Sequence, residues 1–195
     1  MRKIKGCVCF LFALASIAFS GCQSTRKDIV LSGADEKAFA ELEKIEETLV
    51  KLDGEGAGRE KLALPRQQIT ALEGSVADKD FQALLAAWSG RLYLMEGRSS
   101  DAQREYRRSQ NISPLNIPSQ ILAFRLEQDL SRRLSMIDRS LDTEGPLGEL
   151  LIERARTLFA MNRFSEAVAT FDAAFFSLSE KPYYREAYVT FRNKA

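Results

Sequence analysis

Residues 83–116 read ALLAAWSGRLYLMEGRSSDAQREYRRSQNISPLN, and their pattern is the main evidence in the sequence for the fold class. Apolar residues recur at helical spacing before Gly97 and again after it, which predicts two helices joined by a tight turn. Glycine favours such a turn because it accepts left-handed backbone geometry. Residues 148–181, GELLIERARTLFAMNRFSEAVATFDAAFFSLSEK, repeat the pattern with Asn162 at the turn, and asparagine also accepts this geometry. Each stretch therefore predicts a helical hairpin.

Small and large residues occupy matching positions in the two stretches. The small ones are Gly90, Ala102 and Ser109 in the first and Ala155, Ala167 and Ala174 in the second. The large ones are Tyr93 and Tyr106 in the first and Leu158 and Phe171 in the second, which also has Phe164 after its turn. This arrangement resembles the tetratricopeptide repeat (TPR) family, whose repeats have 34 residues. The resemblance implies an all-α fold, a short TPR-like α-solenoid of antiparallel helix hairpins, with an ordinary helical bundle as the alternative.

The chain divides into seven predicted segments. They are 1–21 (lipoprotein signal peptide), 22–34 (lipidated cysteine and flexible tether), 35–82 (N-terminal helical hairpin or diverged repeat), 83–116 (repeat), 117–147 (degenerate repeat), 148–181 (repeat) and 182–195 (C-terminal capping helix). Segment 117–147 has no clean turn inside it, so one long helix is an alternative there. In segment 35–82, the apolar stripe from Phe39 to Leu52 is expected to pack against its own hairpin partner, with a coiled-coil seam as the alternative. Asp78 is expected to cap the helix that leads into the first repeat.

The first 21 residues have the pattern of a secretory signal peptide. A basic start precedes the apolar run Cys7–Phe19, which is too short to cross about 30 Å of hydrocarbon as a helix. The run ends in Phe-Ser-Gly-Cys22, which resembles the lipobox of bacterial lipoproteins, with Phe19 where leucine is usual. The resemblance implies acyl chains on Cys22 that anchor the protein to a membrane. Gln23 after the cysteine implies the periplasmic face of the outer membrane, and an ordinary signal peptide is the alternative.

The composition excludes much enzyme chemistry. The chain has no histidine, and its cysteines are Cys7, Cys9 and Cys22, so the body has no imidazole base and no thiolate cluster. The chain has 28 Lys+Arg and 27 Asp+Glu, and removing the leader's Arg2, Lys3 and Lys5 leaves 25 against 27, a net charge near −2. The glycine-rich loop 54–58 follows a helix and lacks the Lys-Ser/Thr pair of a phosphate loop. We therefore expect no enzyme activity, metal, cofactor or nucleic-acid partner.

The candidate binding residues follow from the TPR resemblance, in which four positions of the first helix of each repeat line a concave groove. Here these positions are Leu84, Ala87, Arg91 and Leu94 in the first repeat and Glu149, Ile152, Arg156 and Phe159 in the second. Arg91 and Arg156 share one position, and guanidinium groups there can hold carboxylates of a partner by paired hydrogen bonds. The asparagines of the family's carboxylate clamp are absent at these positions. The alternative is that both arginines only solvate an apolar surface.

These patterns predict a lipid-anchored adaptor of the bacterial cell envelope that binds an envelope protein or peptide in its groove, in the assembly of an envelope complex. The rival is a ligand-handling lipoprotein that works with a transporter or binding-protein partner. Its pocket would be lined by Trp88, Phe159, Phe175 and Phe176. A purely structural spacer is a third alternative.

Overall fold

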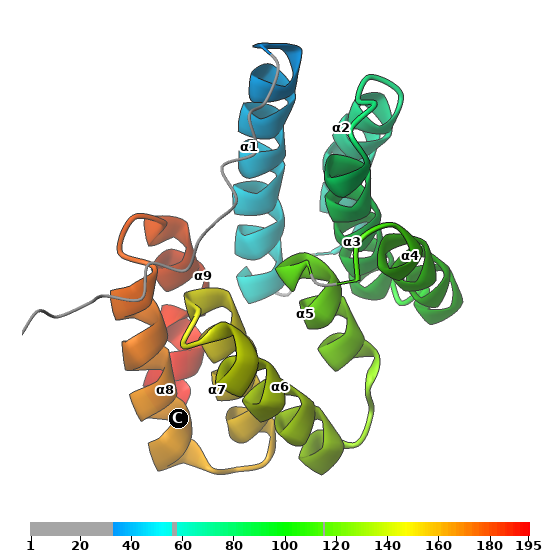
Figure 1. Ribbon diagram of the computed structural model, residues 1–195. Coiled ribbons are helices and arrows are strands. Elements are labelled where there is room, and N and C mark those ends of the chain that lie inside the picture. Colours follow the sequence, from blue (N-terminus) through cyan, green and yellow to red (C-terminus); the bar gives the residue numbers. More distant parts are fainter. Residues whose placement is uncertain (1–32, 56–57, 115) are drawn as a thin grey trace, which may run out of the picture. The chain divides into compact units, whose positions relative to one another are not determined.

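The computed structural model describes residues 33–55, 58–114 and 116–195, and the predicted leader with Cys22 lies outside them. The described residues form helices and turns with no strand among them, so the all-α prediction is confirmed. The elements are α1 (Gly33–Glu55), the 3-10 helix η1 (Arg59–Leu62), α2 (Ala63–Glu73), α3 (Lys79–Met95), α4 (Ser99–Ile112), α5 (Ile117–Leu126), α6 (Leu130–Glu144), α7 (Gly148–Ala160), α8 (Phe164–Ser177) and α9 (Pro182–Lys194) (Figure 1).

Two pairs of consecutive helices, α3–α4 and α7–α8, have the most extensive contacts with each other. Gly97 and Asn162, the residues predicted at their turns, have left-handed φ angles of 75° and 60°. The predicted small residues Ala102, Ser109, Ala155, Ala167 and Ala174 are all 0% exposed. Because these positions carry little side-chain volume, the two helices of each pair approach closely.

The small residue Gly90 serves a contact with the following helix. A Cβ atom added at Gly90 would lie 2.3 Å from Cδ2 of Leu122 in α5 and 3.4 Å from the backbone oxygen of Ala102 in α4. A contact of 2.3 Å is far inside van der Waals distance, so a larger residue here would require the Leu122 side chain to move.

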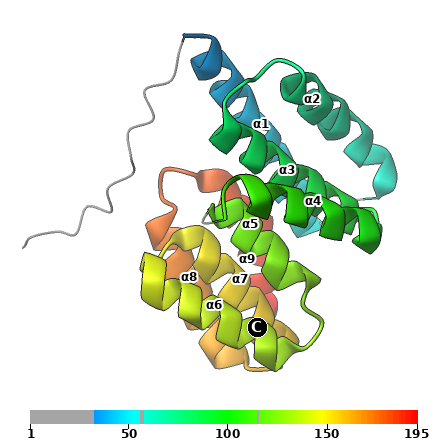
Figure 2. The ribbon, with the colours of Figure 1, turned by 45° about the vertical axis from the view of Figure 1, so that its right-hand side comes forward.

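Segment 117–147 consists of two helices, α5 and α6, so the alternative of one long helix is wrong. The break falls at residues 127–129, where Oδ1 of Asp129 accepts a 2.8 Å hydrogen bond from the Arg132 amide and caps α6. Helix α5 packs mainly against α3 and α4, and α6 packs mainly against α7 (Figure 2). The two helices contact each other less than those of the flanking hairpins do.

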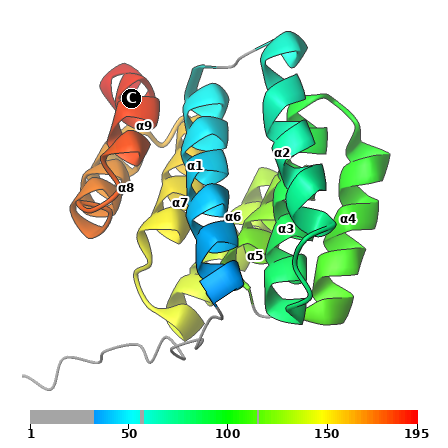
Figure 3. The ribbon, with the colours of Figure 1, turned by 90° about the horizontal axis from the view of Figure 1, so that it is seen from above.

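Helix α1 packs against α2, as expected, but its contact with α9 is more extensive (Figure 3). The sequence predicted α9 only as a cap at the end of the chain. Six apolar residues of α1 are buried: Ala38, Leu42, Ile45, Leu49, Val50 and Leu52. They belong to one core cluster with Trp88 of α3, Ile152 of α7 and Tyr188 of α9. The first and last helices of the described chain therefore share a core, which positions the site below.

Candidate functional site

The predicted groove positions of α7 contact α1 and α9 of the same chain. Ile152 is buried in the core cluster that includes α1, and the Phe159 ring lies edge-on to Phe191 of α9 at 5.8 Å between centroids. Glu149 forms a 3.3 Å ion pair with Lys181, the residue that precedes α9. Glu149, Arg156 and Phe159 are half-buried.

The predicted groove positions of α3 are partly enclosed. Ala87 and Arg91 are buried, and Leu84 packs against the same core cluster. Leu94 is half-buried. The faces of α3 and α7 that the sequence assigns to a groove therefore already cover other helices of the chain, and part of the surface remains accessible at Leu94 and Phe159.

Arg156 holds a carboxylate, which belongs to Asp53 of α1. Its Nη1 lies 2.6 Å from Oδ2 of Asp53, and the same oxygen accepts a 2.6 Å hydrogen bond from the Tyr188 hydroxyl of α9. Arg125 of α5 adds a third donor, with Nη2 at 2.9 Å. The side chain of Asp53 is only 10% exposed. Burial opposes its ionisation, but Arg125, Arg156 and Arg91 outweigh burial and hold the pKa of Asp53 well below its usual range.

Arg125 also binds a second carboxylate, Glu153 of α7. Its Nε lies 3.1 Å from each carboxylate oxygen of Glu153, and its Nη2 lies 2.5 Å from Oε1. Burial opposes ionisation of Glu153, but Arg125 and Arg156 outweigh it and lower the pKa of this carboxyl. Burial and the charge of Asp53 raise the pKa of Tyr188 to about 12, so its hydroxyl stays a hydrogen-bond donor at neutral pH. We call Asp53, Arg125, Glu153, Arg156 and Tyr188 the Asp53 network.

Arg91 and Arg156 occupy the same position of their repeats, but the structure places their side chains in different surroundings. It is 4% exposed, and its guanidinium lies 4.2 Å from the centroid of the Trp88 ring. Within the described residues it forms no ion pair, and its buried Nε has no hydrogen-bond partner. Its charge acts on the Asp53 network at longer range, since it lowers the pKa of both Asp53 and Glu153.

A second carboxylate of α1, Glu46, is also surrounded by a cation and tyrosine hydroxyl donors, as Asp53 is. Oε1 of Glu46 lies 3.1 Å from Lys181 Nζ and accepts hydrogen bonds from the hydroxyls of Tyr184 at 2.9 Å and Tyr183 at 3.3 Å. Lys181 is shared with Glu149, and although burial lowers its pKa, Glu46 and Glu149 outweigh burial and raise it. We call Glu46, Glu149, Lys181, Tyr183 and Tyr184 the Glu46 network.

Chemically, the two networks are arranged to bind carboxylates. Asp53 and Glu46 are each surrounded by cations and hydroxyl donors from outside α1, and hydrogen bonds to ionised groups are the strong ones. Within the described ranges, no three or more Cys, Asp or Glu side chains are grouped so that they could hold a metal ion.

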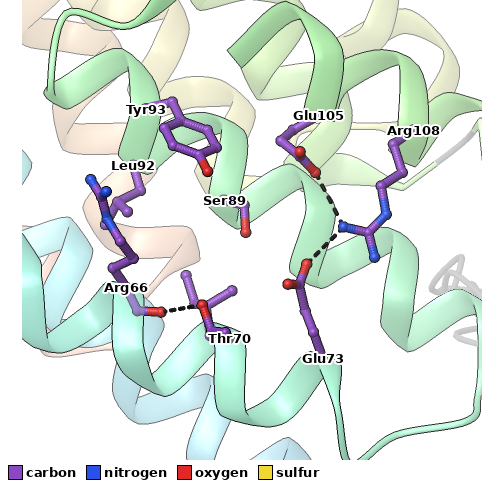
Figure 4. Close-up of a pocket in the computed structure, with 9 residues that line it drawn as sticks. Arg66, Thr70, Glu73, Ser89, Leu92, Tyr93, Glu105 and Arg108 are labelled. Atoms are coloured by element: carbon purple, nitrogen blue, oxygen red, sulfur yellow. Dashed lines mark hydrogen bonds and ion pairs between the residues drawn. The ribbon is translucent and has the colours of Figure 1, made fainter. Parts of the chain in front are cut away.

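A small polar cavity lies between α2, α3 and α4 (Figure 4). Its lining includes Thr70, Ser89 and the ion pair of Arg108 with Glu73, and Glu105 also contacts Arg108. Its volume is about 60 Å³. Organic ligands occupy pockets of roughly 300–1,000 Å³, so this cavity has room only for water or a very small polar molecule.

The aromatic residues of the ligand-handling alternative lie apart from that cavity. Trp88 is buried in the core cluster, Phe175 stacks on Phe171 at 5.9 Å between centroids, and Phe176 is 86% exposed. Phe159 contacts Phe164 and Phe191. None of the four lines the cavity between α2, α3 and α4.

Sequence reasoning missed Asp53, Arg125, Glu153 and Tyr188, as well as Glu46. One signal pointed to Arg125, because it is a lone charge directly after the apolar residues 121–124. Asp53 and Glu46 follow the buried residues Leu52 and Ile45, and therefore lie beside the apolar stripe of α1 rather than opposite it.

Comparisons of the chain with protein families, with curated proteins and with solved structures find no match. Among the described helices, none combines the length and the apolar character needed to cross a membrane.

Proposed function

We propose that this protein is a lipid-anchored adaptor of the bacterial cell envelope, held at the outer membrane through Cys22. Its body would be a short TPR-like α-solenoid, with α5–α6 as the degenerate repeat and α9 as the cap. The matching turns at Gly97 and Asn162 and the buried small residues of α3–α4 and α7–α8 support this architecture. The adaptor binds a protein or peptide partner through the groove formed by α3 and α7.

The contact between Arg156 and Asp53 carries the binding proposal. A groove-position guanidinium receives a carboxylate that a helix presents, beside apolar positions such as Ile152. This is the chemistry that recognises an acidic segment of a protein partner. Leu94 and Phe159 keep part of the same face accessible to such a partner.

Affinity capture from envelope extracts tests the proposal with a matched pair of variants. Leu94→Glu places a charge at a half-buried groove position, and Leu64→Glu places the same charge on α2, where Leu64 is 61% exposed. We expect wild type and Leu64→Glu to capture the same protein and Leu94→Glu to lose it. Equal capture by both variants would move the contact out of the groove. A small molecule that co-purifies in place of a protein would favour ligand handling instead.

A further inference from the structure

We infer that the partner segment is an amphipathic helix with two carboxylates seven residues apart, and that it binds by taking the place of α1. This inference rests on the proposed adaptor function and names the chemistry of the partner. It follows from how the remaining helices receive α1.

Two of the acidic residues of α1, Glu46 and Asp53, contact only side chains from outside α1. Asp53 contacts Arg125 of α5, Arg156 of α7 and Tyr188 of α9. Glu46 contacts Lys181, which precedes α9, and two tyrosines of α9. Seven residues are close to two helical turns, so both carboxylates project from one face of α1.

The charge balance of this surface depends on α1. Four positive charges act on the two carboxylates of α1, those of Arg91, Arg125 and Arg156 on Asp53 and that of Lys181 on Glu46. Glu149 and Glu153 supply two negative charges from α7, and α1 supplies two more. Without α1, two of these cations would therefore have no carboxylate partner, and a helix that covered them again without bringing two carboxylates would bury them unpaired, which is strongly unfavourable. A replacement must bring two carboxylates.

The apolar contacts and one close approach complete the pattern that a replacement must match. Leu42, Ile45, Leu49 and Leu52 form the buried stripe of α1. A Cβ atom added at Gly54 would lie 2.3 Å from the backbone oxygen of Ala187 in α9, so the residue after the second carboxylate must be glycine. The recognised helix thus has apolar residues at the four stripe positions, carboxylates at the positions of Glu46 and Asp53, and glycine at the position of Gly54.

The place of α1 in the chain permits this exchange. It is the first described helix, and only its C-terminal end continues into the other described helices, so its departure breaks no connection between α3, α5, α7 and α9. Its buried stripe keeps it bound when no substitute is present. A partner helix with the same pattern restores the apolar contacts and both carboxylates, and therefore leaves nothing uncovered.

Peptide binding tests the exchange. The probe is a fluorescent peptide of residues 37–55, and the control peptide carries Glu46→Gln and Asp53→Asn. The proteins are wild type and Gly54→Ala, whose own α1 is loosened by the Cβ contact with Ala187. In wild type, the resident α1 competes as a tethered ligand of high effective concentration. We expect the probe to bind Gly54→Ala at least tenfold more tightly than it binds wild type. We also expect Gly54→Ala to bind the probe at least tenfold more tightly than it binds the control peptide.

Two results would overturn the inference in that assay. One is equal binding of probe and control peptide to Gly54→Ala. The other is no binding of the probe to a Gly54→Ala protein whose circular dichroism shows native helix content.

A covalent link provides a second test that does not depend on the stability of Gly54→Ala. Lys51 of α1 and Glu186 of α9 are in contact outside both networks, so Lys51→Cys/Glu186→Cys can be joined by a short bis-maleimide that fixes α1 to α9. We expect the linked protein to lose capture of the partner at least tenfold relative to the unlinked sample of the same variant.

The outcomes separate the two proposals. Capture that survives linking overturns the exchange and leaves the adaptor function standing. Linking between two protein molecules would assign the surface to α1 of a second copy, which also overturns the inference. Absence of any partner for wild type is a failure of the adaptor function, and the peptide assay is read independently of it.

Discussion

Asp53→Asn should destabilise the protein far more than removal of a surface carboxylate does. The substitution keeps the size of the side chain but removes the charge that Arg125, Arg156 and Tyr188 surround at 2.6 to 2.9 Å. The Asp53 side chain is 10% exposed, so water compensates little. Breaking one partner out of a buried ion pair costs about 3–5 kcal/mol. With a urea dependence of about 2–3 kcal/mol per molar, the unfolding midpoint should fall by roughly 1–2.5 M.

Urea unfolding followed by far-ultraviolet circular dichroism measures this change, with Asp172→Asn as the control. Asp172 pairs with Arg192 at 3.0 Å, but its side chain is 52% exposed, and such surface pairs contribute at most about 1 kcal/mol. If the two variants unfold at the same urea concentration, Asp53 is not the buried partner of these donors. The assignment of α1 as occupant of the groove would then fail.

Three further predictions follow. The pKa values of Asp53 and Glu153 are lower in the folded protein than in the unfolded chain, where they are about 4. Their contribution to the free energy of unfolding is therefore full above about pH 4 and is lost as the pH falls below that value. The stability difference between wild type and Asp53→Asn should therefore shrink below about pH 4 in urea titrations, and a constant difference down to pH 2 would contradict the lowered pKa. Ala167→Arg forces a charge into a 0% exposed position and should lower the stability by more than about 3 kcal/mol, as followed by thermal unfolding. Ala169→Arg at an exposed position of the same helix is the control and should change the stability little. Equal unfolding midpoints of the two variants would refute the packing of α7 and α8. Cys22→Ala should abolish fatty-acid labelling and release the protein from membranes, and undiminished membrane retention would rule out the anchor.

Local signals in the sequence predicted most of the helices. The turns at Gly97 and Asn162 were predictable because few residue types accept a positive φ. Asp78 was predictable as a cap, and its carboxylate accepts a 2.7 Å hydrogen bond from the Phe81 amide. The break before Asp129 was not predictable, because the helical spacing of apolar residues continues across it and hides the capping signal of Asp129.

The pairing of α1 with α9 was beyond local reasoning. Asp53 and Tyr188 are 135 positions apart, and periodicity shows only that each helix has an apolar face, not which helix covers it. For the same reason, the sequence predicted that Arg156 can hold a carboxylate, but it did not predict that this carboxylate belongs to Asp53 of the same chain. Arg91 forms no ion pair in the described residues, and the carboxylates of Asp53 and Glu153 pair with Arg125 and Arg156 instead.

Photocrosslinking in living cells tests the adaptor proposal most directly. A photoreactive phenylalanine at position 94 lies in the predicted groove, and the same residue at position 176, where Phe176 is 86% exposed on α8, is the control. We predict a covalent adduct with one envelope protein from position 94 and none from position 176. An adduct from position 176 alone, or none from either position in cells that produce the lipidated protein, would contradict a partner-binding groove.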